Sequence, residues 1–233
     1  MSSPLPPNVH VSKHPCLRAK LSQLRSQSTN SRDVQTLVHE IALMVGYEAL
    51  AQGLETKDDG TTKDHSPLSY EYTRVTITPS SISLVPILRS GLSMIPALSS
   101  LLPFPVPVHH LGLYREKTTL QPVEYYNNLP YHRPSASNPS ASGPAELAII
   151  VDPIIATGAT ACAAIETLKD WGVKKIIMCS VLGSEIGLRK AASEWAEGVE
   201  IWVGGCDKEI DERGMIKPGL GDVGDRLYLT IGK

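Results

Sequence analysis

The pattern of hydrophobic positions predicts two helices after an extended start. Residues 1–15 contain four prolines and no hydrophobic period, which is typical of an extended arm. Leucines spaced by four and then three residues predict a short helix with one apolar face: Leu17, Leu21 and Leu24. A longer amphipathic helix is predicted from Ser31, a candidate N-cap, to about Leu50, before the polar run 57–60.

Short β-prone runs replace the helical period in the middle of the chain. Ile82–Leu88 is predicted as a strand, and the turn 89–91 leads from it into an apolar helical segment that ends near Leu102. Val106–Leu113 is a second strand candidate. Residues 132–145 consist largely of Pro, Ser, Ala and Gly, so we expect an exposed loop insertion there.

Strands and helices alternate regularly after residue 146. The predicted order is strand, helix, strand, helix, strand: Leu147–Val151, Ala159–Trp171, Lys175–Leu182, Ile186–Trp195 and Val199–Val203. Gly172 is the predicted C-terminal stop of the first of these helices. The alternation predicts an α/β fold with a parallel sheet and right-handed crossovers.

Composition and charge limit the classes of function. The 233 residues are 42% hydrophobic, enough for one sizeable core, and we expect a single domain over residues 1–233. Asp and Glu (24) slightly outnumber Lys and Arg (22), so the basic excess of a non-specific nucleic-acid binder is missing. No apolar run approaches the ~18 residues of a membrane span, and the start lacks the pattern of a secretory signal. We therefore expect neither nucleic acid nor a membrane as a partner.

The cysteine spacing indicates isolated thiols. Cys16, Cys162, Cys179 and Cys206 form no Cys-x-x-Cys motif, and in a chain of this length they do not suggest a disulfide framework. Isolated thiols are typical of a reducing compartment, so we expect the protein in the cytoplasm or the nucleus.

The segment 151–160, Val-Asp-Pro-Ile-Ile-Ala-Thr-Gly-Ala-Thr, carries the most informative local chemistry. Its strand delivers the carboxylate of Asp152 at the carboxyl end, where ligands bind in open α/β sheets. The following helix begins with unpaired N–H groups, and Thr157 and Thr160 add hydroxyls. This combination predicts a site for a phosphate that carries neighbouring hydroxyls, such as a phosphosugar. An ordinary βα turn with a capping threonine is the alternative, since the Walker A and Gly-x-Gly-x-x-Gly patterns are absent.

Two further segments offer cations for an anionic ligand. Arg89 leaves the end of a predicted strand, and its guanidinium could fork onto a phosphate. Arg115 lies in the polar run 113–119 after the next strand candidate. A surface arginine and a solvated hairpin are the respective alternatives.

The segment 217–226 contains three glycines and two aspartates. Glycine lets main-chain N–H and C=O groups approach a ligand closely. These backbone donors and acceptors match a flat heterocycle whose edge also alternates donors and acceptors. A plain Gly-Asp turn is the alternative, while a calcium loop is disfavoured because the acids do not follow EF-hand spacing.

Taken together, four segments resemble the uracil phosphoribosyltransferase family: 85–92, 113–122, 151–160 and 218–226. They occur in the family's order, and the weaker match at His14-Pro15 extends the resemblance over nearly the whole chain. The combination of Val-Asp-Pro-x-x-Ala-Thr-Gly with Pro-Gly-Leu-Gly-Asp-x-Gly-Asp-Arg is specific to that family. The resemblance implies a phosphoribosyltransferase-type α/β fold, in which helices flank a parallel sheet core, with a small C-terminal hood and an N-terminal helical arm.

The resemblance also implies a reaction. Uracil and phosphoribosyl diphosphate would give UMP and diphosphate in pyrimidine salvage, with Mg²⁺ bound through the diphosphate rather than by a protein cluster. The enzyme would be a glycosyltransferase and a homodimer or larger homo-oligomer. GTP, which activates some relatives, is a candidate effector.

Residue roles follow from the same resemblance. Asp152, Arg115 and Asp222 would be catalytic, with Asp152 on the ribose hydroxyls and Arg115 facing the diphosphate from a mobile flap. Uracil would meet Ile216, Gly221, Asp222 and Val223, largely through backbone groups. Phosphoribosyl diphosphate would contact Arg89, Arg115, Asp152, Pro153, Ile154, Ile155, Ala156, Thr157, Gly158, Ala159, Thr160 and Asp222.

Several positions depart from the family pattern. Ala159 replaces a glycine and adds a methyl group where the backbone must approach the phosphate. Ser184-Glu185 replaces Ala-Pro, and Cys206 replaces an isoleucine in the hood. Lys217 places a cation next to the expected base site, unless strand alternation points it outward.

Two other functions stay open at this point. One is a phosphoribosyltransferase for a different base. The other is a non-catalytic paralogue that binds phosphoribosyl diphosphate or UMP as a sensor or partner subunit. The four residues Arg89, Arg115, Asp152 and Asp222 favour an enzyme, whereas Ala159 and Lys217 favour the paralogue.

Overall fold

A seven-stranded sheet forms the centre of the computed structural model, which describes residues 4–59, 63–116, 122–130 and 143–230. Its order is β1-β13-β11-β9-β6-β7-β8. The strands are β1 (Val9–Val11), β6 (Ile82–Leu88), β7 (Leu111–Arg115), β8 (Pro122–Asn127), β9 (Leu147–Val151), β11 (Lys175–Ser180) and β13 (Val199–Val203). Neighbouring strands are parallel except β7 and β8. The predicted α/β class with a mostly parallel sheet is therefore confirmed.

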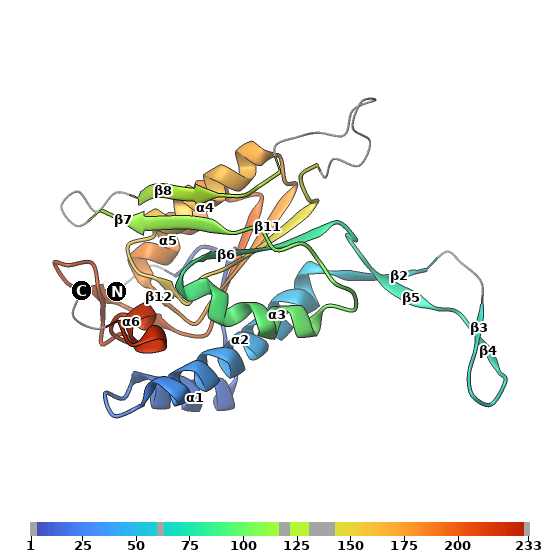
Figure 1. Cartoon of the computed structure of the whole chain (residues 1–233), viewed down its shortest axis with the longest axis horizontal. Coiled ribbons are helices and arrows are strands. Elements are labelled where there is room, and N and C mark those ends of the chain that lie inside the picture. The colour runs from blue at the N-terminus through green and yellow to red at the C-terminus, as the bar shows by residue number, and fades with distance from the viewer. Residues whose placement is uncertain (1–3, 60–62, 117–121, 131–142, 231–233) are drawn as a thin grey trace.

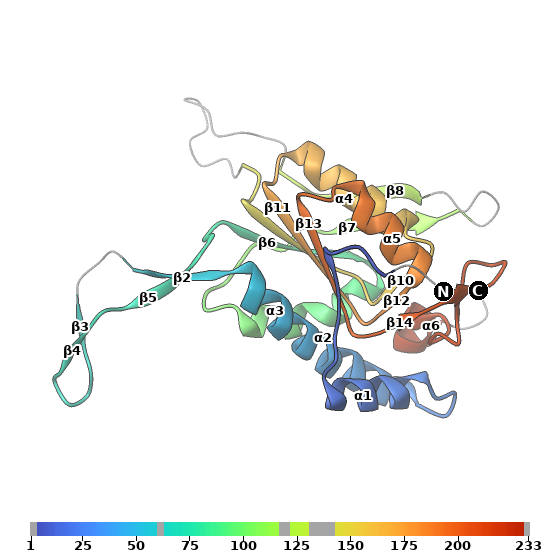
Figure 2. The ribbon, with the colours of Figure 1, turned by 180° about the vertical axis from the view of Figure 1, so that it is seen from behind.

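Helices cover both faces of this sheet (Figures 1 and 2). One face carries α1 (Pro15–Arg25), α2 (Ser31–Gly53) and α3 (Ile95–Leu101), and the other carries α4 (Ala159–Trp171) and α5 (Glu185–Glu194). All five residues of β9 are buried, because alternate side chains enter the two cores. Burial on both faces explains why the central strands are uninterrupted apolar runs in the sequence.

Most element boundaries agree with the sequence pattern, and three differ. The N-cap of α2 is Asn30 rather than Ser31, because the Asn30 side chain accepts the N–H of Asp33. The strand candidate at 106–113 begins only at residue 111, because the segment before it makes a single isolated parallel bridge, in which the Pro107 carbonyl and the His109 N–H bond to Leu84. The predicted strand 175–182 ends at Ser180, and a new strand, β12 (Leu182–Ser184), follows it.

One N-terminal feature differs from the expectation, and the helix that follows it agrees with the predicted apolar face. Part of the predicted extended arm, Val9–Val11, is an edge strand that pairs with β13. The helix α1 packs into the core through its three leucines. Most of the predicted insertion lies outside the described residues.

A hairpin arm projects from the body (Figures 1 and 2). It consists of β2 (Glu55–Asp58) paired with β5 (Val75–Thr78), and β3 (Asp64–His65) paired with β4 (Glu71–Tyr72). Its exposed apolar side chains are Leu68, Tyr70, Tyr72 and Val75. The sequence pattern did not predict this arm, because its strands are short and largely polar.

Smaller elements gather at the carboxyl ends of the parallel strands. A three-stranded parallel sheet contains β10 (Ile154–Ile155), β12 and β14 (Cys206–Asp207). The C-terminal hood follows, with the antiparallel pair β15 (Glu209–Ile210) and β16 (Ile216–Lys217) and the helix α6 (Val223–Tyr228). Within the described residues, no helix combines the length and apolar character needed to cross a membrane.

Candidate active site

Asp152 lies buried directly after β9, with 9% of its surface exposed. Its Oδ1 accepts a hydrogen bond of 3.1 Å from the hydroxyl of Ser90, the first residue of the 3₁₀ helix η1 (Ser90–Met94). Burial raises the pKa of Asp152 to about 7, against the opposing effect of the Ser90 bond and the Ile154 N–H. The Asp152 side chain lies at the edge of the sheet that the C-terminal ends of the parallel strands form. Because its pKa is raised, its charge changes near neutral pH.

The segment from Pro153 to Gly158 forms a tightly packed connection between β9 and α4. Pro153 accepts backbone N–H groups from residues 181 and 182, while residues 154–155 form β10. Gly158 has a φ of +78°, and a Cβ there would lie 2.6 Å from the carbonyl oxygen of Gly187. Only glycine fits this turn without strain, and the turn places the loop directly in front of the helix N-terminus.

Ser184, which stands where the family pattern has alanine, makes two structural hydrogen bonds. The Ser184 side chain caps α5 by accepting the N–H of Gly187 at 2.9 Å, and its hydroxyl donates to the carbonyl of Ala156.

Ala159 is buried as the first residue of α4. Half-buried Thr157 and Thr160 stand on either side of the helix start, and the Thr157 hydroxyl accepts the N–H of Ala159.

A cleft of about 240 Å³ brings two other predicted residues together. Its lining consists of Leu88, Arg89, Ser90, Leu113, Tyr114, Tyr125, Asp222 and Gly224. Arg89 is exposed there, and the hydroxyl of Tyr228 in α6 donates to its carbonyl at 3.1 Å. Asp222 caps α6 by accepting the N–H of Asp225 at 3.0 Å. Ser90 lines this cleft and donates its hydroxyl to Asp152. Three of the predicted site residues, Arg89, Asp152 and Asp222, therefore lie in one region.

Arg115 is the last residue of β7, directly after Tyr114 of the cleft. The strands β7 and β8 form an antiparallel pair, which matches the hairpin alternative for this segment. The part of the predicted flap between residues 117 and 121 lies outside the described residues. The backbone of Arg115 thus lies at the C-terminal end of β7, at the same edge of the sheet as Asp152. The role of Arg115 stays a prediction.

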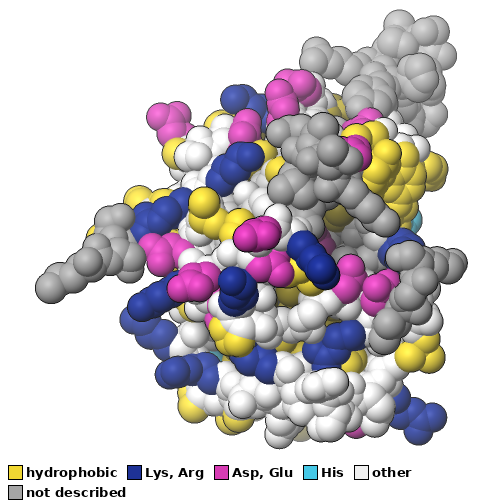
Figure 3. All heavy atoms as spheres, turned by 90° about the vertical axis from the view of Figure 1, so that its left-hand side faces the viewer, with side chains coloured by type: hydrophobic (Ala, Val, Ile, Leu, Met, Phe, Trp, Pro, Cys, Tyr) yellow, Lys and Arg dark blue, Asp and Glu magenta, His cyan; other side chains and the backbone are white. Residues whose placement is uncertain are grey.

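The predicted base contacts lie in the hood. Ile216 and Val223 are buried, whereas Gly221 is exposed with a φ of +71°. Lys217 is exposed next to buried Ile216, so strand alternation points its side chain away from the side that Ile216 packs against. Figure 3 shows this face of the molecule, on which basic and acidic side chains are interspersed.

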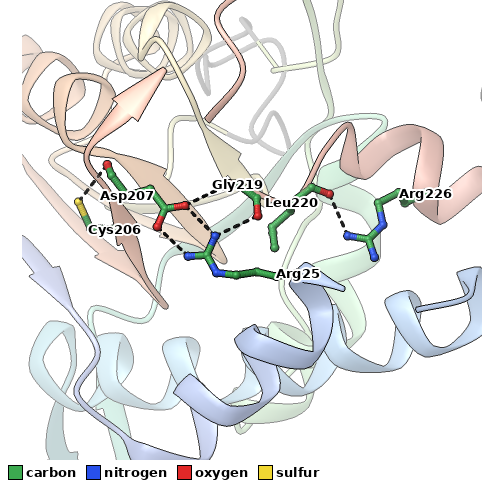
Figure 4. A network of polar contacts seen from close by, with 6 residues as sticks. All are labelled: Arg25, Cys206, Asp207, Gly219, Leu220 and Arg226. Atoms are coloured by element: carbon green, nitrogen blue, oxygen red, sulfur yellow. Dashed lines mark hydrogen bonds and ion pairs between the residues drawn. The ribbon is translucent and has the colours of Figure 1, made fainter. Parts of the chain in front are cut away.

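Two arginines, to which no role is assigned from the sequence, fasten the hood to the body (Figure 4). Arg25, at the end of α1, forms a bidentate ion pair with Asp207, both bonds being 2.7 Å, and also donates to the carbonyl of Gly219. Arg226 donates to the carbonyls of Leu24, Leu220 and Ser26. No local pattern marks Arg25, because Asp207 and Gly219 are far away in the sequence. Arg226 ends the family motif 218–226, but its contacts to the carbonyls of Leu24 and Ser26 also depend on the fold.

Clusters of metal ligands are not evident in the part of the chain that the structure describes, and two of its thiols are deeply protected. No group of three His, Cys, Asp or Glu side chains there could hold a metal ion. Burial raises the pKa of Cys162 to about 11 and of Cys179 to about 12, so these thiols are poor nucleophiles near neutral pH. The cellular compartment stays a prediction.

The parallel sheet, the buried carboxylate at its carboxyl edge, the glycine-threonine loop and the C-terminal hood together define a protein of the phosphoribosyltransferase class. An adenine phosphoribosyl transferase from Trypanosoma brucei shares the fold, with a TM-score of 0.50 at 14% identity, covering 89% of this chain and 87% of that one.

The family model "Uracil phosphoribosyltransferase" matches residues 11–230, and the chain belongs to this family. A uracil phosphoribosyltransferase of Listeria innocua is 40% identical over 224 residues, covering 96% of this chain and 99% of the relative. The structure of the AQ2163 protein from Aquifex aeolicus superposes with a TM-score of 0.81 at 29% identity, covering 95% of this chain and 98% of that one. The fold and enzyme class implied by the sequence resemblance are thereby confirmed.

Proposed function

We propose that this protein transfers the 5-phosphoribosyl group from phosphoribosyl diphosphate to uracil and releases UMP and diphosphate. The observation that carries the proposal is the arrangement of Asp152, Ser90, Arg89 and Asp222 around one edge of the sheet. The family membership and the uracil phosphoribosyltransferase from Listeria innocua support uracil as the base.

The phosphoribosyl half of the site has a chemical rationale. Asp152 would accept hydrogen bonds from the ribose hydroxyls, and the loop 156–160 would hold the 5′-phosphate at the start of α4. Departure of diphosphate builds positive charge on the ribose ring and negative charge on the leaving group. Arg89 and Arg115 would stabilise the leaving group through preorganised charge.

The metal belongs to the same proposal. Mg²⁺ usually keeps several waters and binds through one or two carboxylates together with substrate phosphates. Asp222 offers one exposed carboxylate at the cleft, which fits a metal that arrives with the diphosphate. When bound, Mg²⁺ would neutralise charge on the leaving group.

The base half of the site would use the hood. Ile216, Gly221 and Val223 would meet uracil through backbone groups, and Asp222 would lie between the base and phosphoribosyl diphosphate. Lys217 does not contradict this proposal, because it is the exposed member of β16.

Three broader predictions belong to the proposal. The family match over residues 11–230 supports one domain for the whole chain. The exposed apolar side chains on the hairpin arm support a homo-oligomer, because an isolated two-stranded ribbon is only marginally stable in water. GTP is proposed as an effector, to be tested by adding it to the assay.

The experiment is UMP formation by the purified protein with uracil, phosphoribosyl diphosphate and Mg²⁺, with orotate, hypoxanthine and cytosine in parallel. We expect turnover with uracil alone and a sharp loss in Arg115→Ala. Turnover with another base would indicate altered specificity. Binding of phosphoribosyl diphosphate without any turnover would indicate the non-catalytic paralogue and overturn the proposal.

A further inference from the structure

We propose that Arg25 is a positioning residue for the base-binding loop of the hood, although it lies in α1, far from that loop in the sequence. This inference rests on the proposed function only for the identity of the ligand that the loop holds. The contacts themselves are independent of it.

The guanidinium of Arg25 joins two elements at once. Its two terminal nitrogens each donate to one oxygen of Asp207 at 2.7 Å, and Nη1 also donates to the carbonyl of Gly219 at 2.9 Å. Asp207 Oδ2 in turn accepts the N–H of Gly219 at 3.0 Å. Both backbone polar groups of Gly219 are thereby held by one ion pair (Figure 4).

The loop needs such external contacts. Gly219 and Gly221 have positive φ values of +62° and +71°, and a Cβ at Gly219 would lie 2.1 Å from the carbonyl oxygen of Ile216. Glycine permits this backbone conformation but does not enforce it, because glycine has the largest conformational freedom in the unfolded and loop states. Arg226 holds the next carbonyl, that of Leu220, at 2.8 Å. The two arginines therefore fix successive peptide groups directly before Gly221.

The ion pair also connects the hood to the phosphate side of the site. Asp207 belongs to β14, which shares a three-stranded sheet with β10 of the loop after Asp152. Asp207 is only 9% exposed and the Arg25 side chain 26% exposed, so loss of either partner leaves a poorly solvated charge. Lysine cannot replace Arg25 fully, since it lacks the planar fork that spans Asp207 and Gly219.

The test compares Arg25→Met, Arg25→Lys and Asp207→Asn with Lys20→Met. Lys20 is a matched control, because it also lies in α1 and forms an ion pair of 2.6 Å, but with Glu40 of α2 rather than with the hood. Steady-state kinetics with each substrate varied separately would be combined with hydrogen–deuterium exchange of the peptide 216–223 and with thermal melts.

We expect the uracil KM to rise about tenfold or more in Arg25→Met, with a smaller rise in Arg25→Lys, because charge-assisted bonds to the loop are lost. The KM for phosphoribosyl diphosphate should stay within about threefold, and exchange in 216–223 should become faster. Lys20→Met should change neither.

Equal changes in both KM values, or unchanged exchange in 216–223, would overturn the proposal. The exchange measurement needs no turnover, so it decides the role of Arg25 even if the wild-type protein does not use uracil. In that case the proposed function would fail while the positioning role of Arg25 could still be established. If Arg25→Met does not fold, Arg25→Lys supplies the same comparison.

Discussion

The hydroxyl of Ser90 and the carboxyl of Asp152 are joined by a hydrogen bond of 3.1 Å across the carboxyl ends of two neighbouring strands. Ser90 follows β6 and Asp152 follows β9, and these strands are paired in parallel. Burial raises the pKa of Asp152 to about 7, and the Ser90 bond acts in the opposite direction. Ser90 therefore adjusts the pH range over which the buried carboxyl is charged.

Asp152→Asn is expected to change stability in a pH-dependent way. A carboxyl whose pKa is raised by folding stabilises the folded state in its protonated form, and this contribution is lost as pH rises from its ordinary pKa of 3.8 through about 7. Asparagine resembles the protonated form at every pH. The variant should thus match the wild type near pH 4 and exceed it at about pH 8, by an amount on the order of 4 kcal/mol.

Denaturant unfolding across this pH range checks the stability prediction, and turnover checks the role. Loss of a charged hydrogen-bond acceptor for the ribose should lower turnover about 10- to 100-fold despite the gain in stability. A stability difference that is constant with pH would show that Asp152 does not titrate in this range.

Ser90→Ala should move the pH profile towards higher pH. Because the Ser90 bond lowers the pKa of Asp152, its loss raises that pKa above about 7. The acid limb of kcat/KM for phosphoribosyl diphosphate should shift upward, with most of the activity recovered at alkaline pH. Ser93→Ala is the control, since the Ser93 hydroxyl donates to the carbonyl of Ser90 and not to Asp152. Identical profiles for the two variants would contradict the assignment.

The sequence could predict the elements that carry this site but not every contact between them. The boundaries of β6, β9 and α4 follow from long apolar runs and from the glycine stop at Gly172. Placement of Asp152 and Arg89 at one edge follows from the direction of parallel strands. The Ser90–Asp152 bond was not predictable, because it depends on the strand order, which local periodicity does not contain.

Other features of the fold could not be predicted from the sequence, for related physical reasons. Arg25 and Asp207 are 182 positions apart, and each alone has the pattern of an ordinary surface charge. The strand β1 has only three residues and gains its stability from the edge of a sheet that forms elsewhere. The hairpin arm has no buried stripe within it, so a hydrophobic pattern could not reveal it.

Gly158→Ala and Gly172→Ala form a matched pair at the two ends of α4. Both positions have positive φ, +78° and +106°, so alanine is strained at each by about 1–2 kcal/mol. A Cβ at Gly158 would also lie 2.6 Å from the carbonyl of Gly187, whereas at Gly172 the nearest atom is a Pro144 side-chain carbon at 3.4 Å. Gly158→Ala must therefore displace the proposed phosphate loop.

Thermal melts and substrate kinetics distinguish the two variants. Both should be less stable than the wild type, but only Gly158→Ala should raise the KM for phosphoribosyl diphosphate, by about tenfold or more. An equal KM effect in Gly172→Ala would mean that general destabilisation, and not the loop geometry, controls binding of this substrate.

Lys217→Ile should leave the choice of base unchanged. Lys217 is exposed while its neighbour Ile216 is buried, so the cation points away from the packed side of β16. Ile216→Ala is the contrasting variant, because it removes buried methyl groups beside the proposed base contacts and should raise the uracil KM. Kinetics with uracil and cytosine check both expectations. A change of more than about tenfold in the uracil-to-cytosine ratio for Lys217→Ile, equivalent to about 1.4 kcal/mol, would show that the lysine reaches the base and that this hood reads a different substrate.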